Sequence, residues 1–167
     1  MLNDTFTTFS AMAFALKLLG LRSHSREELE RKLFRKGYTM ESIEPVLETL
    51  TKRGVLDDWI FSMELIRSKS RQRPAGKIKM RAELRKRGIS DEIIEQLLKE
   101  YHSEEFCMRA AEKKIGSLRG TSNTEKKKKL EIFLHNRGFA WQEIQVVLRR
   151  FFQSGSNDEE PFQESSS

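Results

Sequence analysis

Apolar residues recur in one pattern at three places along the chain. A leucine, three residues and a glycine are followed by isoleucine six residues after the glycine, within residues 33–47, 84–98 and 134–148. Counted from each glycine, positions −8, −4, +6, +9 and +10 are apolar in all three copies. This agreement predicts one structural unit repeated about every 50 residues. The glycines are Gly37, Gly88 and Gly138, and the −4 leucines are Leu33, Leu84 and Leu134.

Each copy of the pattern is typical of two helices joined by a tight turn. Apolar residues after the glycine follow the i, i+3, i+4, i+7 spacing of an amphipathic helix. The glycine is expected to end the preceding helix, because it adopts the left-handed conformation without a steric penalty. An apolar residue follows each glycine and can supply the hydrophobic contact of such a cap. A further helical segment precedes each pair, at residues 11–19, 59–70 and 104–115.

Capping signals mark the predicted helix starts. Residues 25–28, "SREE", form a Ser-x-x-Glu capping box. Pro45 predicts that its helix begins at Ser42 or bends, because the proline ring clashes with the carbonyl four residues earlier. The other expected N-cap residues are Thr39, Asp57 or Asp58, and Ser90, whereas Ala140 gives the third copy a weaker start.

These elements predict an all-α fold of three tandem three-helix repeats that resemble helix-turn-helix units. A unit of about 50 residues buries little apolar surface, so neighbouring units are expected to stack. The acidic end of the chain has too few apolar residues to offset its ordering entropy and is expected to be disordered. The predicted segments are an N-terminal extension 1–10, repeats 11–53, 54–102 and 103–153, and the tail 154–167.

Composition agrees with a cytoplasmic helical protein. Charged residues make up 34% of the chain and hydrophobic residues 37%, a balance suited to thin helical modules. The single cysteine, Cys107, excludes an internal disulfide framework and fits a reducing compartment. The most apolar stretch, residues 11–20, is too short to span a membrane and is interrupted by Lys17. No basic segment precedes it, so a signal peptide is not expected.

The charge is strongly positive outside the tail. The whole chain carries a formal charge of +6, but residues 1–153 contain 31 basic and 21 acidic side chains, a net charge of +10. Such a body favours nucleic acid or an acidic protein surface as partner. Ordinary solvated surface is the alternative interpretation of each basic cluster. The candidate binding residues are Arg67, Lys69, Arg71, Arg73, Lys77, Lys79, Arg81, Lys126, Lys127, Lys128 and Lys129.

Other reactive residue types are better explained by structure than by catalysis. Adjacent acids ahead of an apolar helix, Asp57 and Asp58, are expected to be caps, and Cys107 is expected to be a core thiol. No phosphate loop, catalytic constellation or metal-ligand spacing is found in the sequence, so no enzymatic activity, metal or cofactor is predicted. Surface positions are expected for His24, His102 and His135, and packing roles rather than base stacking for Trp59 and Trp141.

The segments that join the copies resemble the RecX family of bacterial regulators of the RecA recombinase. The resemblance covers residues 11–152 and is strongest over 20–98. The sequence departs from the family pattern in "RQRPAGK", residues 71–77, where Arg73 and Pro74 replace the usual glycine and aromatic residue. The matching residues are Arg22, Ser25, Glu28, Leu29, Gly54, Leu56, Asp57, Asp58, Phe61, Ile78, Glu83, Leu84 and Gly88.

This resemblance implies an elongated, curved array that lodges in the groove of the RecA–DNA filament. There, RecX proteins limit filament growth and suppress ATP hydrolysis and strand exchange, and they are not enzymes. The implied partners are the recombinase filament and the single-stranded DNA or DNA phosphates within it, contacted by a monomer with no membrane involved. The implied setting is homologous recombination, DNA repair and the SOS response.

Two other functions compete with this interpretation. A helix-turn-helix module could bind duplex DNA directly, and it would show specific nanomolar affinity without recombinase. Weak binding that falls steeply with salt would instead favour the filament. Charge reversal at Arg71, Arg73, Lys77 and Lys79 with no effect on any partner would favour a purely structural helical-repeat adaptor.

Overall fold

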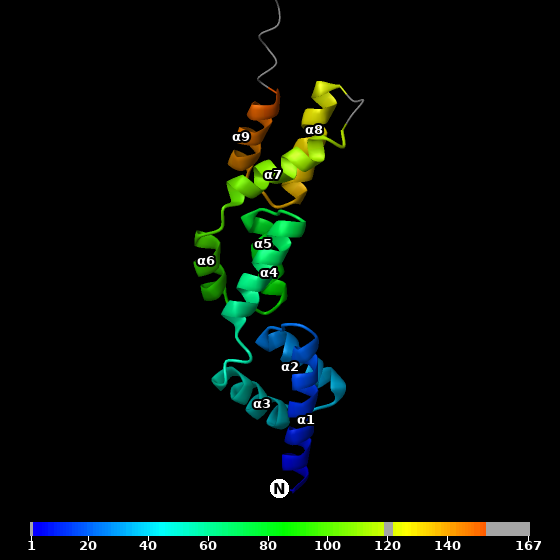
Figure 1. The fold of residues 1–167 in the computed structure, drawn as a ribbon, viewed down its shortest axis with the longest axis vertical. Coiled ribbons are helices and arrows are strands. Elements are labelled where there is room, and N and C mark those ends of the chain that lie inside the picture. Colours follow the sequence, from blue (N-terminus) through cyan, green and yellow to red (C-terminus); the bar gives the residue numbers. More distant parts are fainter. Residues whose placement is uncertain (1, 119–121, 153–167) are drawn as a thin grey trace, which may run out of the picture. The chain divides into compact units, whose positions relative to one another are not determined.

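The computed structural model describes residues 2–118 and 122–152. Within these residues the chain forms α-helices and no strands, which confirms the predicted all-α class (Figure 1). No helix in the described part is long and apolar enough to cross a membrane. The expected disorder of residues 154–167 concerns a segment outside the described residues. The helices are α1 (Leu2–Leu21), α2 (Arg26–Lys36), α3 (Met40–Lys52), α4 (Asp58–Gln72), α5 (Lys77–Lys86), α6 (Asp91–Lys99), α7 (Ser103–Ile115), α8 (Asn123–Asn136) and α9 (Trp141–Phe152).

The three repeated glycines end α2, α5 and α8, as predicted. Their φ angles are 102°, 77° and 75°, all in the left-handed region that favours glycine. In each copy the amide of the next residue donates a hydrogen bond to the carbonyl of the leucine four before the glycine. The three bonds are Tyr38 N to Leu33 O at 3.3 Å, Ile89 N to Leu84 O at 3.2 Å, and Phe139 N to Leu134 O at 3.3 Å. The spacing repeated in the three copies therefore encodes a Schellman-type cap.

The repeated apolar positions form the cores. All fifteen residues at the five positions are buried, except Leu97, which is half-buried. In α3 the helical spacing places Ile43, Val46 and Leu47 on one buried face. The hydrophobic pattern in the sequence thus identifies the side of each helix that packs inward.

Packing between helices separates the chain into two units. The first comprises Met1–Lys69 and Arg81–Tyr101, and the second Ser70–Met80 and His102–Ser167. The division crosses α4 and α5, so residues of the predicted second repeat contribute to both units. The boundaries between the three predicted repeats remain a prediction.

In the first unit, α1 packs against α2 and α3. Ala11 and Ala15 lie one turn apart on α1 and are fully buried against a core that includes Leu29 and Leu47. Helix α1 begins at Leu2, and the division into an N-terminal extension 1–10 and a first repeat remains a prediction. The hydroxyl groups of Ser10 and Tyr38 lie 3.0 Å apart in a hydrogen bond, which ties this part of α1 to the turn after α2.

In the second unit, α7, α8 and α9 pack against one another. The small residues Cys107, Ala110 and Ala111 of α7 face leucines of α8 and the buried face of α9. Burial raises the pKa of the Cys107 thiol to about 12, so it stays protonated and behaves as a small apolar residue. The prediction of a core thiol is confirmed.

Most predicted caps are present. Ser25 Oγ accepts a hydrogen bond from the Glu28 amide at 3.1 Å, and Ser90 Oγ accepts one from the Ile93 amide at 3.5 Å. Asp57 Oδ1 caps α4 by accepting hydrogen bonds from the amides of Trp59 and Ile60, at 2.8 and 3.0 Å. Thr39 stands at the N-cap of α3 but makes no capping bond with its side chain. Where the third copy lacks a capping side chain, Glu143 accepts the Ala140 amide at 2.6 Å.

Two predictions from the sequence were wrong in detail. Of the two outcomes predicted for Pro45, a helix start at Ser42 is wrong, because α3 begins at Met40 with Pro45 inside it; a bend in this helix remains a prediction. Since proline has no amide hydrogen, the cost is one missing bond to the carbonyl of Glu41. His24 is buried rather than on the surface, whereas His102 and His135 are exposed as expected. The polar neighbours of His24 concealed the fact that the α1–α2 connection folds inward.

The burial of His24 and the exposure of the two tryptophans were not evident from the sequence. The His24 Nδ1 atom is 2.8 Å from the carbonyl of Arg22, and burial is the main reason that its pKa lies below the ordinary value. Trp59 is 37% exposed and Trp141 is 58% exposed, so neither residue is buried, and the packing roles predicted for them remain predictions. Both tryptophans stand in the first turn of their helices, where the side chain can project beyond the core.

Candidate functional site

The predicted basic segment 67–81 covers the end of α4, a short connection and the start of α5. Arg67, Arg71 and Arg73 are exposed, and Lys77 is half-buried at the first residue of α5. Within the described residues these four cations form no ion pair, so their charge is available to a partner. Three of them, Arg71, Arg73 and Lys77, belong to the second unit, whereas Arg67 belongs to the first.

The remaining cations of this segment have partners in the fold. Lys69 Nζ lies 3.6 Å from a carboxylate oxygen of Glu83. Arg81 donates two hydrogen bonds to Glu95, at 2.9 and 3.0 Å, and this contact holds the pKa of Glu95 below its usual range. These acids belong to α5 and α6 and lie outside the segment 67–81. The sequence of the segment alone therefore gave no sign of them. Lys69 and Arg81 are therefore weaker candidates than the sequence suggested.

Helix α8 holds the predicted lysine run, Lys126–Lys129, near its N-terminus. Lys127, Lys128 and Lys129 are exposed and Lys126 is half-buried. Lys79 lies near the other end of the same helix, where its Nζ donates to the carbonyl of Asn136 at 3.3 Å. Nine residues of α-helix separate Lys127 from Asn136, which corresponds to about 14 Å. The lysine run and the connection thus form two distinct basic surfaces within the second unit.

The connection "RPAG", residues 73–76, is held by backbone contacts with the turn between α8 and α9. The Gly76 amide donates to the carbonyl of Arg137 at 2.9 Å, and the Ile78 amide donates to the carbonyl of Gly138 at 3.3 Å. The Arg137 guanidinium donates to the carbonyl of Pro74 at 3.4 Å. A Cβ atom on Gly76 would lie 2.0 Å from the Gly138 oxygen. Close backbone approach at Gly76 therefore positions the exposed cations on either side of it.

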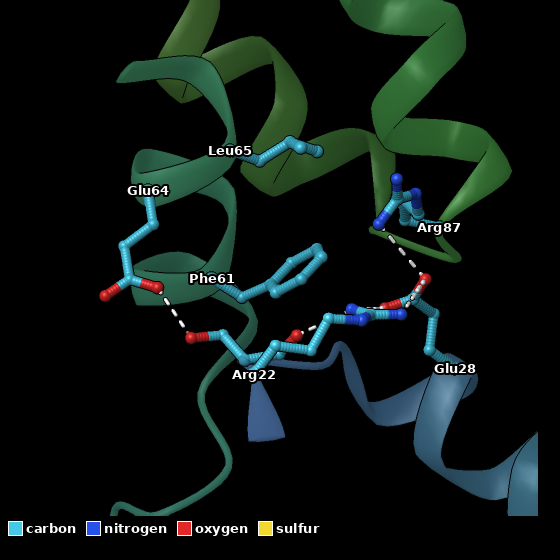
Figure 2. A pocket seen from close by; sticks show the side chains of 7 residues that line it. Arg22, Glu28, Phe61, Glu64, Leu65 and Arg87 are labelled. Carbon is cyan, nitrogen blue, oxygen red and sulfur yellow. Dashed lines mark hydrogen bonds and ion pairs between the residues drawn. The ribbon is translucent and has the colours of Figure 1, made fainter. Parts of the chain in front are cut away.

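A polar network that charge counting did not reveal lies in the first unit. The Glu28 carboxylate accepts hydrogen bonds from Arg22 and from Arg87, each at 3.1 Å (Figure 2). Arg87 also donates a hydrogen bond to Glu83 at 3.2 Å. Ser25 Oγ donates to the carbonyl of Arg87. These bonds link the α1–α2 connection and α2 to the turn between α5 and α6.

The charge of Glu28 is stabilised by its partners. Burial alone would raise the pKa of this carboxyl group, but the hydrogen bond from Arg22 and the charges of both arginines outweigh burial, and the pKa is lowered. Its side chain is only 12% exposed. The carboxylate thus behaves as a largely covered anion shared by two guanidinium groups.

Beside this network is a cavity of about 500 Å³ (Figure 2). Phe61 and Leu65 of α4 supply apolar walls, and Glu64 of α4 accepts a hydrogen bond from Ser23 at 2.7 Å. The two arginines at its edge, Arg22 and Arg87, are paired with Glu28, so neither is an unpaired cation for an anionic ligand in the cavity. Several residues around it, Arg22, Ser25, Glu28, Phe61 and Glu83, also carry the family resemblance, which is the signal that could have identified the network.

The nearby Asp58 has a second structural role. Its carboxylate accepts the Arg26 amide at 2.8 Å, so a residue at the start of α4 caps the start of α2. Burial is the main cause that raises the pKa of Asp58. Asp57 and Asp58 are thus both caps, as predicted, although they cap different helices. Within the described residues, no group of three or more His, Cys, Asp or Glu side chains is arranged to hold a metal ion.

Most of this chain matches proteins of known family. The family description "RecX, first three-helix domain" matches residues 11–50, and "RecX, second three-helix domain" matches residues 57–98. The chain is 60% identical over 151 residues to the regulatory protein RecX of Pelodictyon phaeoclathratiforme, covering 90% of this chain and 94% of that protein. It is 50% identical over 145 residues to the regulatory protein RecX of Chlorobium limicola, covering 87% and 91%.

A solved structure shares the fold. The crystal structure of RecX from Lactobacillus salivarius superposes with a TM-score of 0.77 at 22% identity, covering 90% of this chain and 97% of that one. This likeness supports the all-helical architecture.

The close approach at Gly76 yields a stability prediction. Gly76→Ala places a methyl group against backbone that cannot move aside, so we expect the free energy of unfolding to fall by about 2–3 kcal/mol. Gly116→Ala is the matched control, because its nearest neighbour is 4.0 Å away and its φ is −61°; it should be neutral or slightly stabilising. Denaturant unfolding measures both, and equal stability of the two variants would contradict the assigned contact.

The Glu28 network yields a prediction of pH dependence. Because the folded pKa of Glu28 is lowered, its contribution to stability is present above the ordinary value of 4.5 and is lost as pH falls through the lowered value. Glu28→Gln should lower the free energy of unfolding by about 1–3 kcal/mol at pH 7. The variant should also lose less stability than the wild-type protein as the pH falls. Glu48→Gln, at an exposed pair with Lys52, should change stability by less than about 1 kcal/mol. Unfolding curves from pH 7 to pH 3 test this prediction. It would be contradicted if Glu28→Gln lost stability at low pH to the same extent as the wild-type protein.

Proposed function

Because the chain belongs to the RecX family, we propose that it regulates the RecA recombinase by binding the RecA–DNA filament. As a monomer in the groove of that filament it would limit filament growth, ATP hydrolysis and strand exchange. The observation that carries the proposal is family membership over nearly the whole described chain, with 60% identity to a regulatory protein RecX. With this partner, the proposed setting is the cytoplasm, and the proposed processes are homologous recombination, DNA repair and the SOS response.

The exposed cations of the connection between α4 and α5 supply the proposed contact. Arg71 and Arg73 are exposed and make no ion pair within the described residues, and the docked turn at Gly76 holds the backbone beside them. A fixed positive surface attracts DNA phosphates or acidic side chains of the recombinase without the entropy cost of ordering a loose loop. We assign Lys77 and Lys79 to the same surface, and Lys126–Lys129 to a second one.

We further propose that the protein has no catalytic activity of its own and acts by occupancy. Its one thiol, Cys107, is buried and has a pKa of about 12, which is unsuited to nucleophilic chemistry. The acidic pair Asp57 and Asp58 is occupied by backbone amides. A bound protein can regulate the filament without catalysis if it binds one state of the filament more tightly than another.

Recombinase assays test the proposal directly. Purified protein is added in stoichiometric amounts to RecA-type recombinase, ATP and single-stranded DNA, and the rates of ATP hydrolysis and strand exchange are measured. Both rates should fall. Unchanged rates for the wild-type protein would contradict the proposed function.

Charge reversal tests the contact surface. Arg71→Glu with Arg73→Glu should raise the concentration needed for half-maximal inhibition about tenfold, since two exposed charge contacts contribute about 0.7 kcal/mol each. Lys52→Glu with Arg53→Glu is the matched control, because both residues are exposed at the end of α3 and the charge change is identical. Equal inhibition by the two double variants would move the contact away from the connection.

A further inference from the structure

The helices that follow the repeated glycines differ in the side chains they expose. Four and seven residues after the glycine, both α3 and α6 carry glutamates, whereas α9 carries glutamines. The six residues at these matched positions are Glu41 and Glu44 in α3, Glu92 and Glu95 in α6, and Gln142 and Gln145 in α9. All six are exposed or half-buried, so the difference concerns the solvent face rather than the core.

The same contrast continues along α9. Eleven residues after the glycine stand Glu48 in α3, Lys99 in α6 and Arg149 in α9, all exposed. The acid of α9, Glu143, accepts the Ala140 amide at 2.6 Å and so serves as a cap. The outer face of α9 therefore combines neutral amides with a cation, while the matched face of α3 is acidic and that of α6 has acids at both glutamate positions.

An aromatic ring completes this face. Trp141, three residues after Gly138, is 58% exposed, and the matched residues are Met40 in α3 and Asp91 in α6. Helical spacing places Trp141, Gln142, Gln145 and Arg149 on one side of α9. Trp141 stands three residues before Ile144 and seven before Leu148, so it lies at the edge between this outer face and the buried face of α9. More than half of the residue is nevertheless open to solvent.

We propose that this outer face of α9 binds single-stranded DNA directly, with an unpaired base stacked on the Trp141 ring. Every base has a face that can stack on an aromatic side chain, and each such contact is sequence-tolerant. The amides of Gln142 and Gln145 donate to base edges or phosphate oxygens, and Arg149 attracts the phosphates. In α3 and α6 the acids at the first matched position, Glu41 and Glu92, repel a phosphate backbone, whereas Glu44 and Glu95 are paired with Arg26 and Arg81. Helix α9 has no acid at either position and is therefore better suited to this ligand.

The ligand is single-stranded because the ring must reach the face of a base. In a duplex those faces are stacked on one another, and separating them costs free energy that one exposed tryptophan does not recover. This site lies outside the basic segments of the proposed function and needs no recombinase. It would give the protein its own hold on the DNA strand that a filament occupies.

The test uses the full chain and a fluorescently labelled oligo(dT) of 20 nucleotides, without recombinase, and follows anisotropy. The wild-type protein should bind, with an affinity that falls as salt rises. Trp141→Ala should weaken binding about 5- to 150-fold, the range of one base–aromatic stack. Met40→Ala, at the matched exposed position of α3, should remain within twofold of wild type.

A second pair of variants tests the charge argument independently of the ring. Gln142→Glu installs the acid that α3 and α6 carry and should weaken binding about fivefold or more. Gln96→Glu, an exposed glutamine on α6, should have no effect beyond twofold. Thermal unfolding confirms that each variant folds, which is expected because the changed side chains are exposed.

Three results would overturn the inference: no binding of oligo(dT) by the wild-type protein, binding by Trp141→Ala within twofold of wild type, or duplex bound as tightly as single strands. None of these concerns inhibition of the recombinase, so the proposed function could survive them. Conversely, DNA binding through α9 without any effect on recombinase would contradict the proposed function and leave this inference intact.

Discussion

The hydrogen bond from the residue after each repeated glycine to the leucine four before it is the constraint on which the architecture depends. It ends one helix, reverses the chain and fixes where the next helix begins, and it requires a left-handed residue that glycine supplies without strain. The leucine contributes twice, through its carbonyl in the cap and through its fully buried side chain in the core. Because this leucine belongs to both the cap and the core, a shift of the turn along the sequence would remove its side chain from the core.

That coupling explains why the sequence predicted so much of the fold. Local signals and packing signals coincide at Leu33, Leu84 and Leu134, so the periodic pattern located helices, turns and buried faces together. The failures occurred where burial came from distant segments. His24 sits among polar residues, and nothing near it in the sequence indicates that it is buried. Pro45 is tolerated inside α3 because packing of the helix outweighs one missing hydrogen bond.

The candidate site was harder to predict, because charge in the sequence is not the same as charge available to a partner. Arg81 and Lys69 appeared equivalent to Arg71 and Arg73, yet acids from α5 and α6 neutralise the first two. The residues that carry the family resemblance have the opposite character. Arg22, Ser25 and Glu28 hold the connection of α1 and α2 to the turn after α5, so their role is to preserve the fold. In the proposed function, side chains at the surface recognise the partner.

The central claim is that the turns build the scaffold while exposed cations and α9 meet the partner. Hydrogen–deuterium exchange of the full chain, with and without a recombinase filament on single-stranded DNA, tests this division most directly. The account predicts slower exchange in residues 70–79 and in α9 when filament is present, with the amides of α3 unchanged. Protection confined to α3 and α6, with residues 70–79 and α9 unaffected, would contradict it.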